Sequence, residues 1–365
     1  MKKGRHRGKW IALLAASVFA AGLIFGGCGS DQDPMRIAFV GDTESGEYQG
    51  ACGELWDGIS DYLNDHNAEA ENYVPADTSV SAGRDAMEKA IDAGADVIVC
   101  VGEQMGNAVY DLQQRENHTQ FVLVDALPTD GTGESRERIR GNTYCIRINR
   151  EEAGFLAGYA AVMDGSRTIG YLGGSREEEN VKYGSGFIQG AEYAGASQKL
   201  GDGAITVMYG LIPSDAVDPA QVAEINGWFQ EGCQIISVSG NGPEFIGIES
   251  AKESGGKIIT ADMNHSELDS EVVAAASGIN YTKVARLALQ QVQNGTLKGG
   301  EITEYGIKEN GVRMAFSDTG FENFTVQQYS EVVKQIKSGE IRITGKDVSK
   351  NPEKNGITIC KIENK

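Results

Sequence analysis

The sequence has few of the residues on which common catalytic and metal sites depend. Its 365 residues include 4 His, 6 Cys and 7 Pro, and they contain no CxxC pair, HExxH motif, P-loop or GxSxG motif. Five cysteines stand singly along the chain, at Cys52, Cys100, Cys145, Cys233 and Cys360. This spacing predicts no metal site, and the odd number argues against a disulfide framework. We therefore expect neither a metal nor a cofactor.

Positive charge is concentrated at the start of the chain. Residues 1–27 carry five Lys or Arg and no acidic residue, so 28 basic and 52 acidic residues follow, a net charge of −24. A surface this acidic repels nucleic acid and anionic lipid. We therefore expect no nucleic-acid partner.

The amino-terminal segment predicts export. Basic residues precede an uncharged apolar run from Trp10 to Phe25, which is typical of a secretory signal peptide. The stretch Ile24–Cys28, with Gly26 and Gly27 before the cysteine, resembles the lipobox of bacterial lipoproteins. The resemblance implies cleavage after residue 27, acylation of Cys28 and a lipid-anchored location on the extracytoplasmic face of the cell membrane. An uncleaved anchor helix with an incidental cysteine is the alternative.

Short apolar runs alternate with helical patterns along the rest of the chain. Strands are expected at 36–40, 96–101, 121–125, 168–172, 205–209, 234–238 and 257–262. Helices are expected at 55–63, 84–92, 105–115, 151–163, 181–194, 220–229, 243–253, 281–292 and 325–337. This alternation predicts an α/β protein built from βαβ units with parallel sheets. The length is too great for one ordinary core, so two doubly wound lobes are expected.

Acidic residues follow three of the expected strands, at Asp42, Asp125 and Asp262. In doubly wound sheets, ligands bind beyond the carboxyl ends of the strands, so these carboxylates are candidate ligand contacts. The alternative for each is a turn former or helix cap.

Longer motifs identify a family. The stretch 151–161 reads EEAGFLAGYAA, 170–174 reads GYLGG, 183–191 reads YGSGFIQGA and 121–125 reads FVLVD, followed late in the chain by Phe324-Thr325. In this order and spacing, residues 35–343 resemble the basic membrane protein family of lipoproteins, the purine nucleoside receptor A-like binding components of ABC importers. The resemblance implies a type 1 periplasmic-binding-protein fold whose lobes are joined by hinge crossovers. The small residues within 151–161 are expected to pack that helix closely on a sheet.

The resemblance also implies lobe boundaries. An N-terminal lobe would comprise 35–146 and 275–302, and a C-terminal lobe 147–274 and 303–345. Residues 28–34 would form the anchor linker, and 346–365 a polar tail.

The family's site residues transfer in part. Asp125 matches a ligand contact, Asp262 a ribose-hydroxyl acceptor, Gly240 a glycine near the ligand, and Tyr183 a ring that stacks on the base. The alternative for Tyr183 is a core ring with its hydroxyl satisfied. The complete candidate set is Asp42, Tyr48, Gln104, Asp125, Tyr183, Gly240, Asn241, Asp262 and Asn264.

The chain departs from the family where a second ring is expected. Ala51 and Cys52 stand where the family has a stacking Phe and an Asn, and no Lys occurs in 274–279. Tyr48 is a candidate replacement for the ring. A nucleoside is thus the first expected ligand, and a sugar or another small polar metabolite the second.

The expected function is a monomeric, non-enzymatic solute-binding lipoprotein that serves an ABC permease. One alternative is a sensor that feeds a membrane signalling partner. The other is an enzyme such as a nucleoside hydrolase, against which the lack of clustered carboxylates argues.

Overall fold

A computed structural model describes residues 33–41, 50–132, 137–212, 218–261, 263, 271–316 and 320–365. The predicted signal peptide, Cys28, Asp42, Tyr48, Asp262 and Asn264 lie outside these residues. Among the described helices, none combines the length and the apolar character needed to cross a membrane.

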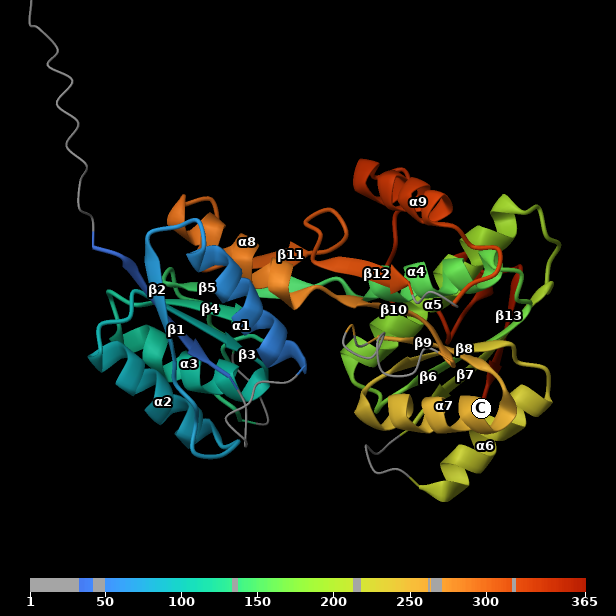
Figure 1. Ribbon diagram of the computed structural model, residues 1–365, viewed down its shortest axis with the longest axis horizontal. Coiled ribbons are helices and arrows are strands. Elements are labelled where there is room, and N and C mark those ends of the chain that lie inside the picture. Colours follow the sequence, from blue (N-terminus) through green and yellow to red (C-terminus); the bar gives the residue numbers. More distant parts are fainter. Residues whose placement is uncertain are drawn as a thin grey trace, which may run out of the picture. The chain divides into compact units, whose positions relative to one another are not determined.

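The first sheet is parallel throughout (Figure 1). Its strand order is β11 (Ile302–Tyr305), β5 (Thr143–Ile148), β4 (Gln120–Val124), β3 (Val97–Val101), β1 (Met35–Val40) and β2 (Ala68–Asn72). The helices that pack with this sheet are α1 (Gly50–Leu63), α2 (Val80–Asp92), α3 (Glu103–Arg115) and α8 (Tyr281–Gln293). The central strands are uniformly apolar, because helices cover both faces of the sheet.

The second sheet is parallel except for one antiparallel edge pair, β10 with β12. Its strand order is β12 (Val312–Phe316), β10 (Val273–Ile279), β9 (Lys257–Thr260), β8 (Ile235–Ser239), β6 (Thr168–Gly173), β7 (Ile205–Leu211) and β13 (Cys360–Asn364). Its helices are α4 (Arg150–Met163), α5 (Glu178–Ser197), α6 (Pro219–Gln230), α7 (Asn241–Ser254) and α9 (Val326–Ser338), and a short 3₁₀ helix η2 (Glu353–Asn355) precedes β13.

The chain passes between the sheets after β5, after β10 and after β11. These crossovers are tied to one another by backbone hydrogen bonds. The Asn149 amide donates to the Tyr305 carbonyl at 2.9 Å, and the Asn280 amide donates to the Gly311 carbonyl at 2.9 Å. The predicted hinge crossovers are therefore present, but the exchange points lie at about 149, 280 and 306–311 rather than at the predicted boundaries. Strand β10 belongs to the second sheet and β11 to the first.

The prediction of a polar tail at 346–365 is wrong. Residues Cys360–Asn364 pair in parallel with Ile205–Tyr209 and extend the second sheet. Ile357, Ile359 and Cys360 are buried against the core, so alternate apolar side chains hold this segment in place despite its polar composition.

Helix α4 packs on β10 and β12 of the second sheet as expected, but its glycines face another helix, which corrects the expectation for Gly154 and Gly158. A Cβ at Gly154 or Gly158 would collide with the carbonyl oxygens of Tyr183 or Phe187 in α5. Reciprocally, Gly190 of α5 lies against the Phe155 carbonyl. Paired glycines thus let the two helix backbones approach each other closely.

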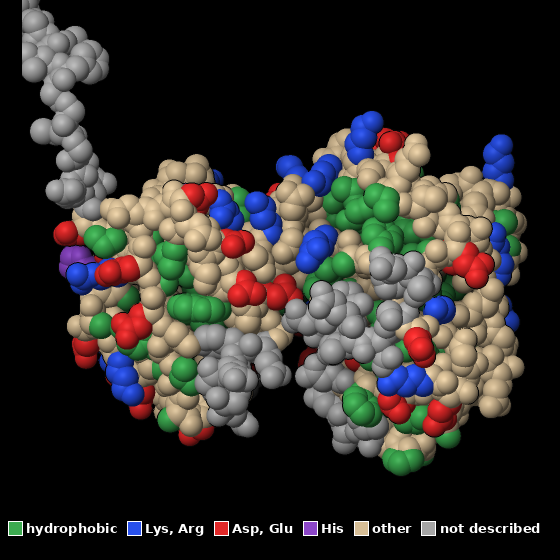
Figure 2. Space-filling view, viewed as in Figure 1, with side chains coloured by type: hydrophobic (Ala, Val, Ile, Leu, Met, Phe, Trp, Pro, Cys, Tyr) green, Lys and Arg blue, Asp and Glu red, His purple; other side chains and the backbone are tan. Residues whose placement is uncertain are grey.

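Acidic and basic side chains are interspersed on the face seen in Figure 2. The described cysteines are buried, and none of them forms a disulfide with another described residue.

Candidate ligand-binding site

A pocket of about 330 Å³ lies where the two sheets meet. Its lining comes from the starts of α1, α4, α7 and α8 and from the carboxyl ends of β9 and β10: Gly50, Ala51, Glu54, Arg150, Gly240, Glu244, Ala261, Met263, Ile279 and Tyr281. Ligand sites of doubly wound sheets occupy this position relative to the strands.

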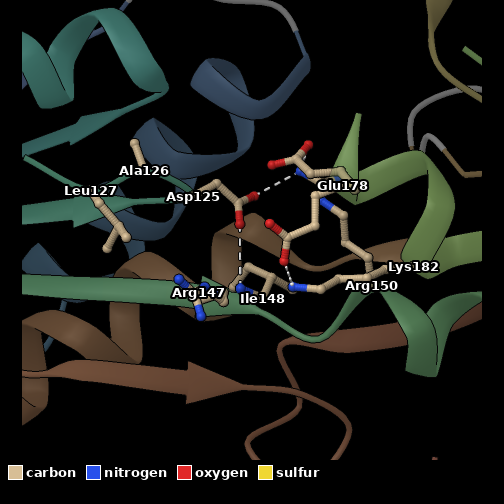
Figure 3. Close-up of a pocket in the computed structure, with 9 residues that line it drawn as sticks. Asp125, Ala126, Leu127, Arg147, Ile148, Arg150, Glu178 and Lys182 are labelled. Carbon is tan, nitrogen blue, oxygen red and sulfur yellow. Dashed lines mark hydrogen bonds and ion pairs between the residues drawn. The ribbon is translucent and has the colours of Figure 1, made fainter. Parts of the chain in front are cut away.

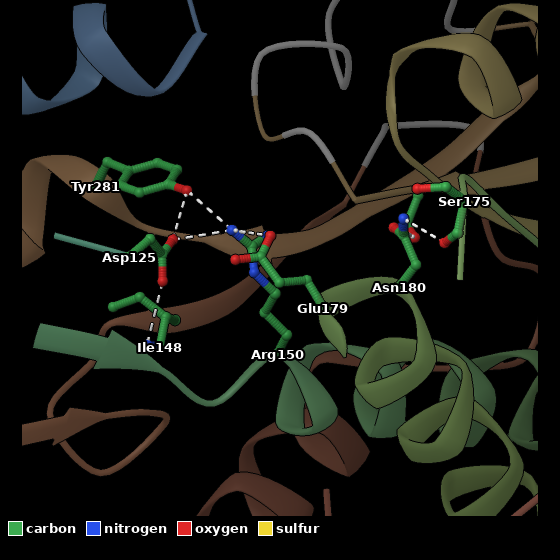
Figure 4. A network of polar contacts seen from close by, with 8 residues as sticks. Asp125, Ile148, Arg150, Ser175, Glu179, Asn180 and Tyr281 are labelled. Carbon is green, nitrogen blue, oxygen red and sulfur yellow. Dashed lines mark hydrogen bonds and ion pairs between the residues drawn. The ribbon is translucent and has the colours of Figure 1, made fainter. Parts of the chain in front are cut away.

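The polar centre of the site is Arg150, the first residue of α4 (Figure 4). Its Nη2 lies 2.9 Å from Asp125 Oδ2 and 3.2 Å from Glu179 Oε2, and it donates to the Tyr281 hydroxyl at 3.4 Å. Tyr281 in turn donates to Asp125 Oδ2 at 2.9 Å. Asp125 and Tyr281 come from the side of the first sheet and Glu179 from the second, so one guanidinium connects both halves.

Asp125 is held in an unusual backbone conformation. It follows β4 with φ of 53°, in the left-handed region that Asp tolerates better than most residues. The Ile148 amide donates to its Oδ1 at 3.3 Å, and its own amide donates to the Ile146 carbonyl at 2.9 Å. These bonds fix the carboxylate at the joined ends of β4 and β5.

Arg150 and Tyr281 each keep one charge state over the ordinary pH range. Burial alone would lower the pKa of the Arg150 guanidinium, but Asp125, Tyr281 and Glu179 outweigh burial and raise it. Burial, together with the Asp125 carboxylate, raises the pKa of Tyr281 well above its usual value. Arg150 therefore remains a cation, and Tyr281 remains a protonated donor.

Arg150 also lines a second pocket, of about 190 Å³ (Figure 3). Arg147, Glu178 and Lys182 contribute charged side chains to this pocket. Lys182 Nζ is paired with Glu178 Oε1 at 2.5 Å. Arg150 lines both pockets. Asp125 lines the smaller one and accepts hydrogen bonds from Arg150 and Tyr281, which line the larger one.

Glu244 supplies a buried carboxylate from the opposite wall of the larger pocket. It lies in the first turn of α7, is 2% exposed and accepts a hydrogen bond from the Thr260 hydroxyl. Gly240 precedes α7 with φ of 100°, a conformation that favours glycine. On the facing wall, Glu54 accepts the Tyr281 amide at 3.2 Å.

The predicted site residues are only partly brought together. Asp125 lines the smaller pocket, and Gly240 lines the larger one. Gln104 is exposed in the first turn of α3 and lines neither pocket. The Asn241 side chain is outside the described atoms, as are Asp42, Tyr48, Asp262 and Asn264 as whole residues.

Tyr183 occupies the core, as the alternative interpretation of this residue had it. Its side chain is 3% exposed, and its ring stacks on Tyr171 at a centroid distance of 5.8 Å. Its hydroxyl lies 3.2 Å from Ser237 Oγ and donates to the Ser277 carbonyl at 3.1 Å. In this conformation the ring lines neither pocket.

Sequence reasoning missed Arg150, Tyr281, Glu54 and Glu244. Arg150 and Tyr281 each follow the end of a strand by two residues, and this position was the available signal. Among the described residues, no group of His, Cys, Asp and Glu is arranged to hold a metal ion.

Comparison with known proteins gives one consistent picture. A model of the family described as ABC transporter substrate-binding protein, PnrA-like, matches residues 49–347. The ABC transporter nucleoside-binding protein BmpA of Lactococcus lactis subsp. cremoris is 22% identical, over 93% of this chain and 99% of its own length.

Solved structures agree on the fold. A solute-binding protein of an ABC transporter system from Aeropyrum pernix K1 superposes with a TM-score of 0.65 at 14% identity, covering 88% of this chain and 98% of its own. AraP, an arabinose-binding protein from Geobacillus stearothermophilus, gives a TM-score of 0.60 at 13% identity, covering 80% and 100%. The predicted type 1 periplasmic-binding-protein fold is thus confirmed.

Proposed function

Because this chain belongs to the PnrA-like family of ABC transporter substrate-binding proteins, we propose that its own ligand is a nucleoside, captured outside the cytoplasm for a membrane permease. The observation that carries the proposal is the larger pocket, to which both halves of the molecule contribute polar side chains. A ligand that touches both walls stabilises the closed arrangement of two hinged lobes. The name of the BmpA relative supports the choice of nucleoside.

The chemistry of the pocket suits a ribose. Glu54 and Glu244 present carboxylates from facing walls, and one carboxylate accepts hydrogen bonds from two neighbouring hydroxyl groups. Asp262, which lies between the lining residues Ala261 and Met263, is proposed as a further acceptor.

Binding measurements on the full-length protein test this proposal. Isothermal titration with nucleosides, free bases and sugars should give saturable binding for nucleosides. Glu244→Gln should weaken it by about tenfold, as expected for one lost charged hydrogen bond. Gln104→Ala, outside both pockets, is the matched control and should leave affinity unchanged. Absence of nucleoside binding would overturn the proposal.

A sugar is the second candidate ligand. Tyr281 is the only aromatic residue among the described lining of the larger pocket, whereas carboxylates suit a polyol. The fold likeness to an arabinose-binding protein does not by itself choose between the two ligands. Binding of sugars but not nucleosides in the same titration would select this candidate.

Membrane attachment through Cys28 is proposed from the sequence motif alone. Acylation would hold the acidic chain at the outer face of the membrane, beside its permease. Radiolabelled palmitate should be incorporated into the wild type and not into Cys28→Ala, and the variant should be released into the soluble fraction. Equal labelling of both would contradict the anchor. We further propose that the protein is not an enzyme, so incubation with nucleosides should release no free base.

A further inference from the structure

Arg150 is held firmly but is not saturated. Its Nη2 makes the contacts to Asp125, Glu179 and Tyr281, whereas Nε and Nη1 have no hydrogen-bond partner among the described residues. Nε is buried, and Arg150 is one of the residues that line the larger pocket. Buried donors without partners are rare in folded proteins, and one in a binding pocket points to a group that the ligand supplies.

Asp125, by contrast, has both oxygens engaged. Oδ1 accepts the Ile148 amide, and Oδ2 accepts Arg150 and Tyr281. A carboxylate with these bonds orients the guanidinium, so Asp125 is a positioning residue. The Tyr281 hydroxyl gives its hydrogen to Asp125 and keeps only a lone pair for a ligand. Arg150 is therefore the donor that the network presents to the pocket.

The other charged groups in the pocket are acceptors. Glu54 and Glu244 face the space that Arg150 lines, and each carboxylate has several lone-pair sites. A 6-oxopurine presents a carbonyl acceptor beside an N1–H donor, whereas adenine presents an amino donor beside an N1 acceptor. A cationic donor that faces position 6 bonds to the carbonyl of the first edge and opposes the amino group of the second, while a carboxylate beside it accepts N1–H of the first edge only.

We infer that Arg150 determines base specificity by donating to a base carbonyl, so that the protein prefers 6-oxopurine nucleosides to adenosine. This inference rests on the proposed nucleoside function and names the substrate class within it. It assigns Asp125 and Tyr281 the task of holding Arg150 in place.

The test compares ligands first and variants second. With the full-length wild type, inosine and guanosine should bind about 10- to 100-fold more tightly than adenosine or purine riboside, the range expected for a hydrogen bond to a charged group. Arg150→Gln should weaken inosine binding by a similar factor and change adenosine binding by less than about threefold. Arg147→Gln is the matched control, because Arg147 lines only the smaller pocket. Its preference should equal that of the wild type.

The outcomes separate the two proposals. If no nucleoside binds, the nucleoside function fails and this inference fails with it. If nucleosides bind but inosine and purine riboside bind alike, the inference alone is overturned. The same holds if a folded Arg150→Gln protein, judged by circular dichroism, keeps the preference. If that variant does not fold, the wild-type ligand series still decides, because inosine differs from purine riboside only at the 6-carbonyl and N1–H.

Discussion

Helix α4 has two different surroundings along its length. Its first residue, Arg150, lies in a charged network and lines two pockets, and two of its nitrogen atoms have no hydrogen-bond partner among the residues that the structure describes. One and two turns later, Gly154 and Gly158 contact the backbone of α5 so closely that no methyl group fits at either position. The comparison teaches that the stretch 151–161, the most distinctive in the sequence, serves packing, while binding chemistry lies at its edge.

The packed end of α4 should give the largest effect. In Gly158→Ala the new methyl group would meet backbone atoms of Phe187 and Ala191, which cannot move aside without separating the helices. We expect the free energy of unfolding to fall by about 2–3 kcal/mol, as for overpacked cores. Urea unfolding followed by far-UV circular dichroism measures the change.

Gly227→Ala in α6 is the control, because a Cβ there meets nothing within 4 Å. Alanine in an open helical position should raise the free energy of unfolding by about 0.5–1 kcal/mol. Equal responses of the two variants would show that the close approach of α4 and α5 is not what requires glycine.

How much of the fold could be predicted from the sequence differs between the centres and the edges of the two sheets. Strands such as Val97–Val101 were recognised because they are apolar throughout, as central parallel strands are. The edge strands β2, β11, β12 and β13 were missed, because an edge strand exposes part of its length and tolerates polar residues such as those of Ala68–Asn72. The interior strands β5 and β10, each next to an edge strand, were missed as well. Hydrophobic pattern therefore predicts most of the central strands of each sheet and not its edges.

The site could be predicted only where a residue directly follows a strand. Asp125 and Gly240 have that position, and both line a pocket. The bond between Asp125 and Tyr281 joins residues 156 positions apart, so only the folded chain reveals it. Tyr183 was expected at the ligand from the family resemblance, and the sequence could not decide against this position because it does not say which face of α5 meets the sheet.

At the charged end, Asp125→Asn should have the next largest effect on stability. The Asp125 side chain is 8% exposed and Arg150 is 25% exposed, so removing the carboxylate leaves a partly buried cation with Glu179 alone. We expect a loss of about 1–3 kcal/mol in urea unfolding. Asp111→Asn breaks an exposed pair with Arg84 at 2.8 Å and should change stability by less than about 1 kcal/mol. Equal losses would contradict the role given to burial.

The pH dependence of stability gives a second test of the first turn of α4, in which Glu152 lies. Burial raises the pKa of this carboxyl, whose Oε2 accepts the Ile307 amide at the crossover after β11. The folded state then binds the proton more readily than the unfolded state. Stability should therefore fall as pH rises from the usual glutamate pKa to the raised folded value, and stay constant above it.

Glu152→Gln should remove this dependence and be at least as stable as the wild type at pH 7. Urea midpoints measured between about pH 3 and pH 7.5 give the comparison, because this range includes the windows of both carboxyls. Glu178→Gln is the control of opposite sign, because the hydrogen bond from Lys182 lowers the pKa of Glu178. Its contribution is present above the usual glutamate pKa and is lost as pH falls through the lowered value. If the stability of Glu152→Gln changed with pH in parallel with that of the wild type, the Glu152 carboxyl would not be the source of the pH dependence.

Tyr281→Phe should have the smallest effect, because it removes one hydroxyl and leaves the Arg150–Asp125 pair intact. The lost bond to Asp125 Oδ2, at 2.9 Å, should lower the free energy of unfolding by about 1 kcal/mol. Tyr144→Phe is the matched control, since the Tyr144 hydroxyl makes no hydrogen bond with a described residue, and it should change stability by less than about 0.5 kcal/mol. In the Asp125→Asn background the Tyr281 substitution should lose most of its effect, because the two side chains act through one bond. Full additivity in that double-mutant cycle would mean that Tyr281 stabilises the fold through its ring and not through the network around Arg150.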